Sequence, residues 1–156
     1  MVQELAISLI KKLQEKNLTI SVAESLTGGL VAASLTEIPG ASKVFKGSIT
    51  AYSDEIKQNI LNVNKETILK FTSISEQVAL EMAINVRTIM KSDIGISTTG
   101  VAGPEKSAGF APGLVFVAIS IGDHNMCQKL EITGDRSKIR NQTVHEILQL
   151  TLSRLV

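Results

Sequence analysis

Six consecutive apolar residues, Leu114 to Ile119, place the strongest limit on how this chain can fold. Successive side chains of a β-strand point to opposite faces of the sheet, so an unbroken apolar strand needs cover on both faces. Two layers of helices, one on each side of a sheet, provide that cover. The segment therefore predicts a buried strand in a sheet between helices.

Helix-like and strand-like segments alternate along the rest of the chain. Residues 1–16 place Leu5, Leu9 and Leu13 on one helical face, whereas residues 18–23 alternate and are β-branched, as strands are. This interleaving predicts an α/β fold, a three-layer α/β/α sandwich. Further helices are expected at 30–35, from 53, from 76 to 90 and from 135, and further strands at 45–52, 94–99, 114–119 and 127–133.

Three helix starts carry capping signals. Thr27 is available as the N-cap of the helix at 30–35, and Ser53 opens the next helix ahead of two acidic residues. Ser73 is followed three residues later by Glu76, which is the spacing of a capping box.

Length favours a single domain, residues 1–156, and the composition argues against binding of nucleic acid. A chain of 156 residues is close to the common size of one domain. Its net charge of +1 argues against binding nucleic acid through bulk charge, and 3% aromatic residues offer no platform for stacking bases.

The sequence argues against a membrane-spanning protein, a Cys- or His-based metal site and an internal disulfide. One cysteine, Cys127, excludes an internal disulfide and a Cys-based metal cluster, and two histidines, His124 and His145, are too few for a His-rich zinc site. No apolar run approaches the roughly 20 residues of a spanning helix, and the first residues lack the features of a signal peptide. We expect a soluble cytoplasmic protein without metal or cofactor.

Three polar, glycine-rich segments follow predicted strands: 24–29, 52–57 and 98–104. Ligands of open α/β sheets bind outside the carboxyl ends of the strands. We therefore expect the functional site where these three segments meet.

Ser25 lies between a predicted strand and a predicted helix, in the segment Glu24–Gly29. Backbone N–H groups at a helix N-terminus attract a phosphate or an oxyanion, and glycines allow a ligand to approach closely. The same residues also suit a simple capping turn, because Ser and Thr are common caps. The segment is neither a Walker A motif nor a Rossmann glycine motif.

Lys57, Arg136 and Arg140 can each be interpreted in two ways, as a functional residue of the site or as a solvated surface residue. Lys57 lies about one turn into the helix after Tyr52, where a buried lysine can act as base to a serine, although most lysines are solvated. Arg136 and Arg140 share a helix face and suit either a phosphate clamp or solvent. No His or Cys suits a catalytic triad, so hydrolysis would need a Ser–Lys pair.

Five segments, in the same order, resemble the signature of the CinA C-terminal domain, the nicotinamide-nucleotide amidohydrolase (PncC) family. They are Ala23–Gly29 (AES-x-TGG), Gly47–Lys57 (G-x-x-x-x-YSN-x-x-K), Ser75–Glu76 with Ala83 (S-E…MA), Thr99–Pro104 ([ST]GIAGP) and Gly134–Arg140 (GDR-x-x-x-R).

This resemblance implies hydrolysis of the carboxamide of nicotinamide mononucleotide to nicotinate mononucleotide and ammonia, by a homodimer or higher homo-oligomer of α/β/α subunits. Ser25 would be the nucleophile, and Lys57 and Tyr52 would activate it or shuttle its proton. Substrate-binding positions implied by the match are Glu24, Thr27, Gly28, Gly29, Thr99, Gly100, Gly103, Arg136 and Arg140.

Two departures from the family pattern bear on the substrate. Residues 105–113 lack the family's glycine pair and are one residue shorter, and Ala111 replaces a Lys before the proline. Asp54 replaces the usual Asn. The alternatives to the amidohydrolase are therefore a non-catalytic nucleotide-binding protein and an amidohydrolase with a changed substrate.

Overall fold

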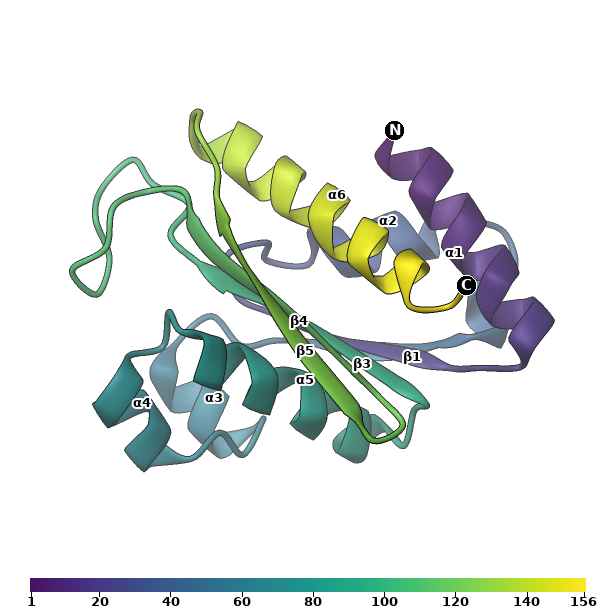
Figure 1. Ribbon diagram of the computed structural model, residues 1–156, viewed down its shortest axis with the longest axis horizontal. Coiled ribbons are helices and arrows are strands. Elements are labelled where there is room, and N and C mark those ends of the chain that lie inside the picture. Colours follow the sequence, from purple (N-terminus) through teal and green to yellow (C-terminus); the bar gives the residue numbers. More distant parts are fainter.

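The computed structural model describes residues 1–156 and contains one five-stranded sheet between two layers of helices (Figure 1). Its strands are β1 (Ile20–Glu24), β2 (Phe45–Thr50), β3 (Ile94–Gly100), β4 (Leu114–Ile121) and β5 (His124–Glu131). They lie in the order β2-β1-β3-β4-β5. β2, β1 and β3 are parallel, whereas β4 and β5 each run antiparallel to the strand before them in the sheet.

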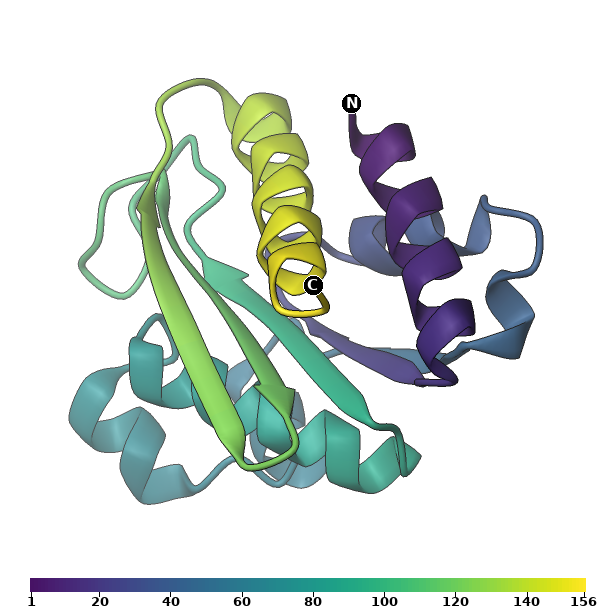
Figure 2. The ribbon, with the colours of Figure 1, turned by 45° about the vertical axis from the view of Figure 1, so that its right-hand side comes forward.

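The helices divide between the two faces of the sheet, as Figures 1 and 2 show. One layer contains α1 (Val2–Lys16), α2 (Leu30–Thr36) and α6 (Arg136–Ser153). The opposite layer contains α3 (Asp54–Asn59), α4 (Lys65–Phe71) and α5 (Glu76–Met90), and a short 3₁₀ turn, Ala41–Lys43, precedes β2. This arrangement confirms the predicted three-layer α/β/α sandwich.

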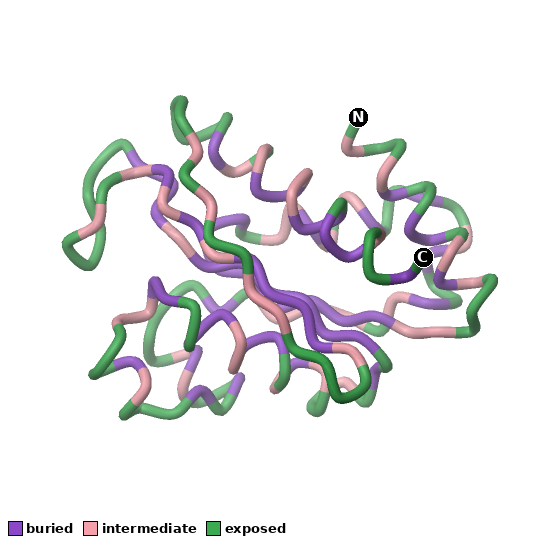
Figure 3. The backbone as a smooth tube through the Cα atoms, viewed as in Figure 1, coloured by how far each residue is buried: buried purple, intermediate pink, exposed green.

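The apolar strand β4 contributes to a separate core on each face. Val115 and Val117 belong to the large cluster formed with α1, α2 and α6, while Ala118 packs against Ala79 and Ala83 of α5. Figure 3 shows the central strands buried along most of their length. The two-sided cover expected from the sequence is therefore present.

Gly95 allows α5 to lie close to the sheet. A Cβ atom at this position of β3 would overlap the carbonyl oxygen of Ala83 in α5. Only glycine therefore fits here without displacing the helix. This close packing fixes α5, whose first turn starts beside the carboxyl end of β3.

Most element boundaries lie within a few residues of the predicted ones, and the differences have local causes. β1 begins at Ile20 because the Thr19 amide donates to the Asp93 carboxylate, 2.7 Å away. β5 begins at His124 because the β4–β5 turn uses only residues 122 and 123. The short helix α4 was not expected, since Ile68 is its one buried residue and no apolar face marks it.

Two of the predicted caps are wrong and one is confirmed. Ser53 caps α3 by accepting the Ile56 amide. α5 is capped by Ser75, which accepts the Val78 amide, and not by Ser73. Gly29, not Thr27, occupies the N-cap of α2.

Candidate active site

The carboxyl ends of the parallel strands open into a cavity of about 740 Å³. β1 lies between β2 and β3, so the segments that follow these three strands meet at one edge of the sheet. The start of α6 and the loop after β3 complete the walls. Lining residues are Ser25, Leu26, Tyr52, Asp54, Lys57, Ser73, Ile74, Glu105, Ser107, Ala108, Arg136 and the run 99–104.

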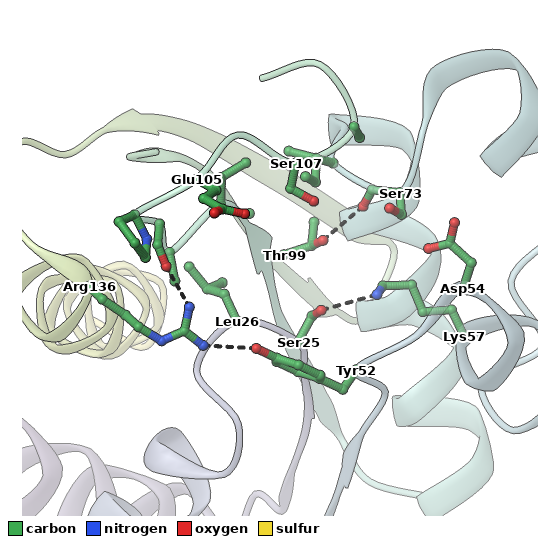
Figure 4. Close-up of a pocket in the computed structure, with 17 residues that line it drawn as sticks. Ser25, Leu26, Tyr52, Asp54, Lys57, Ser73, Thr99, Glu105, Ser107 and Arg136 are labelled. Carbon is green, nitrogen blue, oxygen red and sulfur yellow. Dashed lines mark hydrogen bonds between the residues drawn. The ribbon is translucent and has the colours of Figure 1, made fainter. Parts of the chain in front are cut away.

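Lys57 and Ser25 meet at the base of this cavity (Figure 4). The Lys57 ammonium nitrogen donates to Ser25 Oγ at 3.0 Å and to the Ala51 carbonyl at 3.0 Å. Both side chains are buried, with Lys57 only 3% exposed. Lys57 is therefore not a solvated helix lysine, which was the alternative left open by the sequence.

Burial lowers the pKa of Lys57 below its ordinary value of 10.5, because the charged ammonium loses its hydration. The Asp54 carboxylate opposes this effect and raises the Lys57 pKa. Asp54 lies at the start of α3, three residues before Lys57, and lines the same cavity. The Lys57 amine and the Ser25 hydroxyl can therefore exchange a proton, and such an exchange is how an adjacent base activates a nucleophile.

Tyr52 lines the cavity, but its hydroxyl lies at Arg136 and makes no hydrogen bond to Ser25 or Lys57. Arg136 Nη2 donates to the Tyr52 hydroxyl at 3.0 Å, and Nη1 donates to the Gly103 carbonyl at 2.6 Å. The Tyr52 side chain is 60% exposed, and Figure 4 shows it lying along the cavity toward α6. Of the three predicted catalytic residues, the structure thus joins only Ser25 and Lys57 directly.

Glu24 does not line the cavity and is fully buried. Its carboxylate accepts the amides of Gly29, Val31 and Ala32, at 2.9 to 3.1 Å. The turn that was expected to bind a ligand anion through Thr27, Gly28 and Gly29 therefore already holds the protein's own carboxylate. A capping turn was the alternative from the sequence, and Glu24 supplies the cap through its longer side chain.

Thr27 and Arg140 also lie away from the cavity lining. Thr27 is buried, with its hydroxyl 2.7 Å from the hydroxyl of Thr98. Arg140 donates to the carbonyls of Leu26 and Thr27, at 3.0 and 3.1 Å. Of the residues that the resemblance implies bind substrate, Arg136 thus lines the cavity, whereas Thr27 and Arg140 do not.

The end of β3 and the segment after it supply the opposite wall. Thr99, Gly100 and Gly103 line the cavity as expected, and Thr99 Oγ1 donates to the Ser73 carbonyl at 2.8 Å. Glu105 and Ser107, from the loop that departs from the family pattern, also line it. Ala111 and Lys106 are exposed and lie outside the lining.

Asp54, Ser73, Glu105 and Ser107 were not predicted as site residues. Ser73 ends the segment that contains the unrecognised helix α4, so its place beside β3 had no signal in the local sequence. Asp54 precedes Lys57 by three residues on one helix, and this spacing alone places the two on one face.

Other reactive groups lie elsewhere in the molecule. Burial raises the pKa of the Cys127 thiol, in β5, to about 12, so this thiol is not activated. No group of three His, Cys, Asp or Glu side chains is arranged to hold a metal ion. None of the helices is long and apolar enough to cross a membrane.

The sequence profile of the CinA C-terminal domain matches residues 2–155. The chain belongs to the CinA C-terminal domain family. A putative competence-damage inducible protein of Thermoanaerobacter pseudethanolicus is 44% identical over 149 residues, which is 95% of this chain. A CinA-like protein of Dictyoglomus thermophilum is 46% identical over 142 residues, or 90% of this chain. The chain spans only 36% and 34% of the length of these two relatives.

Solved structures of the CinA family have the same fold. The competence or damage-inducible protein of Enterobacter asburiae superposes with a TM-score of 0.98 at 34% identity, covering 100% of this chain and 99% of that one. The competence/damage inducible protein of Agrobacterium tumefaciens gives a TM-score of 0.94 at 34% identity, covering 99% and 94%. The fold expected from the resemblance is therefore the fold of this family.

Proposed function

We propose that this CinA-family domain hydrolyses the carboxamide of nicotinamide mononucleotide, giving nicotinate mononucleotide and ammonia. The observation that carries the proposal is the 3.0 Å hydrogen bond between Lys57 Nζ and Ser25 Oγ in a cavity open to a small molecule. A nucleophile paired with a base is what amide hydrolysis without a His triad requires. The family motifs around Ser25 and Lys57 support the choice of substrate.

In the proposed reaction, Ser25 Oγ attacks the carboxamide carbon while Lys57, as a neutral amine, accepts the hydroxyl proton. The tetrahedral intermediate collapses, the C–N bond breaks, and Lys57 returns the proton to the leaving nitrogen, which departs as ammonia. The product is an ester on Ser25. Lys57 then takes a proton from a water molecule that attacks the ester, and Ser25 recovers its proton as the carboxylic acid product leaves.

The burial of Lys57 supports its role as the base. A lysine must lose its proton before it can accept one, and the lowered pKa of Lys57 increases the fraction of neutral amine near pH 7. Asp54 limits this shift and so keeps the amine basic enough to remove a proton from a hydroxyl.

The charges around the cavity suit a pyridine mononucleotide. The substrate carries a cationic pyridinium ring and an anionic phosphate. Asp54 and Glu105 face the cavity as carboxylates, and Arg136 faces it as a cation held by Tyr52 and Gly103. We assign the phosphate to Arg136, because the Thr27–Gly29 turn is already bound to Glu24.

A changed amide substrate is the second candidate, because Glu105 lies in the loop that departs from the family pattern. A carboxylate on this wall disfavours a phosphate placed beside it. An ammonia-release assay on nicotinamide mononucleotide, its phosphate-free riboside and free nicotinamide separates the candidates. The proposal predicts the highest kcat/KM with the mononucleotide; preference for the riboside indicates a changed substrate, and no release from any of them leaves the non-catalytic nucleotide-binding protein.

A further inference from the structure

We propose that Arg140 is a positioning residue for the nucleophile, because its guanidinium holds the carbonyl groups of the two residues that follow Ser25. Arg140 Nε donates to the Leu26 carbonyl at 3.0 Å, and Nη2 donates to the Thr27 carbonyl at 3.1 Å. The planar fork of one guanidinium thus spans two successive carbonyls of the nucleophile loop, residues 25–29. This inference rests on the proposed function, since it takes Ser25 as the nucleophile.

The nucleophile loop needs such an anchor because it contains two glycines, and glycine restricts the backbone less than any other residue. Gly28 and Gly29 have φ values of +57° and +106°, in the left-handed region that glycine adopts readily. Glu24 ties the far end of the loop to α2, and the Thr27 hydroxyl meets that of Thr98. Arg140 is the cation that fixes the backbone carbonyls of Leu26 and Thr27, between Ser25 and the two glycines.

The Arg140 guanidinium has no acidic partner. None of the ion pairs in the molecule includes Arg140, and its two hydrogen bonds to other residues both go to the loop carbonyls. A Cβ atom at Gly28 would lie 3.3 Å from Arg140 Nη2, so guanidinium and loop are in tight contact. The charge therefore acts on the loop backbone.

Arg136 and Arg140 have different tasks although they lie one turn apart on α6. Arg136 is exposed, lines the cavity and reaches Tyr52 and Gly103. Arg140 is half-buried and lies outside the cavity lining. Loss of Arg140 should consequently lower kcat and leave KM nearly unchanged, whereas loss of Arg136 should raise KM.

The size of the expected effect follows from the need for alignment. A displacement of about 1 Å in a reacting group lowers a rate by roughly 100-fold. We expect Arg140→Gln to lower kcat by about 10- to 100-fold with KM changed less than about twofold. Arg140→Lys, which keeps the charge but not the fork, should recover part of the loss.

The test compares Arg140→Gln, Arg140→Lys and the matched control Lys138→Gln, which removes an exposed charge from the same helix. Two readouts are measured: ammonia release from nicotinamide mononucleotide, and the rate at which a fluorophosphonate probe labels Ser25, followed by mass spectrometry. We expect Arg140→Gln to be slow in both, Arg140→Lys intermediate, and Lys138→Gln equal to wild type. Melting temperatures are recorded for all variants.

The labelling readout separates this proposal from the substrate assignment. Labelled wild-type protein that releases no ammonia contradicts the proposed substrate, while slow labelling of Arg140→Gln still supports the positioning role. Two kinetic results for Arg140→Gln overturn the positioning role: labelling of Ser25 at the wild-type rate, or a rise in KM at unchanged kcat. The role is also overturned if labelling is lost only because the variant has unfolded, as its melting temperature shows. Wild-type protein that is neither labelled nor active overturns both proposals.

Discussion

Lys57 of α3 donates to Ser25 Oγ across 3.0 Å, although 32 residues separate them in the chain. Ser25 follows β1 and Lys57 follows the neighbouring strand β2, so their meeting depends on the parallel pairing of these strands. Ser53 caps the start of α3, and the first turns of this helix place the Lys57 side chain in the buried base of the cavity. The pair is a product of the topology, and the predictions below depend on it.

Replacing Lys57 with methionine should abolish turnover while preserving the fold. The variant removes the base but keeps an apolar chain of similar length in a buried site. We expect kcat to fall by about 10³-fold or more in Lys57→Met, and the double variant Ser25→Ala/Lys57→Met to be no slower than Ser25→Ala alone, since the two residues act as one unit. Ammonia release by the three variants measures this; independent, multiplicative losses would contradict the pairing.

The same variant should change how stability depends on pH. The folded-state pKa of Lys57 lies below 10.5. At pH values between this lowered pKa and 10.5, the unfolded chain therefore binds a proton that the folded protein has released. Stability of the wild type therefore gains from rising pH in that window, and Lys57→Met lacks this gain. Urea unfolding of both proteins from neutral to alkaline pH checks the sign, and parallel curves would show that Lys57 keeps its ordinary pKa.

Asp54 should set the acid limit of activity. Its carboxylate raises the Lys57 pKa, so Asp54→Asn should lower that pKa and extend kcat/KM to lower pH. The measurement is the pH profile of kcat/KM for wild type and Asp54→Asn. Glu55→Gln, an exposed neighbour outside the cavity lining, is the matched control and should leave the profile in place. An acid limb that moves upward in Asp54→Asn would contradict the sign.

Arg136 and Tyr52 should act on substrate binding. One charge-assisted hydrogen bond contributes about 1.5–3 kcal/mol, so Arg136→Gln should raise KM for the mononucleotide about 10- to 150-fold and leave KM for the riboside nearly unchanged.

Tyr52→Phe removes only the hydroxyl that accepts from Arg136, and should change kcat less than about tenfold. A large loss of kcat in Tyr52→Phe would restore the proton-shuttle role implied by the resemblance.

Glu24 should contribute to stability. Glu24→Gln keeps the shape but replaces one acceptor oxygen with an NH₂ group that faces amide donors. Leaving buried polar groups unpaired costs about 1–3 kcal/mol, and we expect the free energy of unfolding to fall by this amount. Urea denaturation measures it, with the exposed Glu37→Gln as control.

The layers of the fold could be predicted from the sequence because the spacing of apolar residues indicates which face of each helix or strand packs against the core. The β4 run and the helical face of α1 both pack as expected. α4 was missed because its burial depends on one residue, Ile68. The cap of α2 was misassigned because Glu24, eight residues before Ala32, reaches it only after the loop has folded back.

The candidate site was predictable in part for the same reason. Strand ends placed Ser25, Tyr52 and Lys57 at one edge of the sheet, but side-chain direction decides which of them touch. Two arginines one turn apart, Arg136 and Arg140, look equivalent in the sequence. Only the path of the loop after Ser25 shows that one meets the cavity and the other meets the backbone.

Ammonia release from nicotinamide mononucleotide by wild-type protein and by Ser25→Ala tests the central claim most directly. The account predicts steady turnover by the wild type and a loss of about 10⁴-fold or more in Ser25→Ala, with an unchanged melting temperature within a few degrees. Turnover by folded Ser25→Ala near the wild-type rate would contradict it, because no serine ester could then lie on the reaction path.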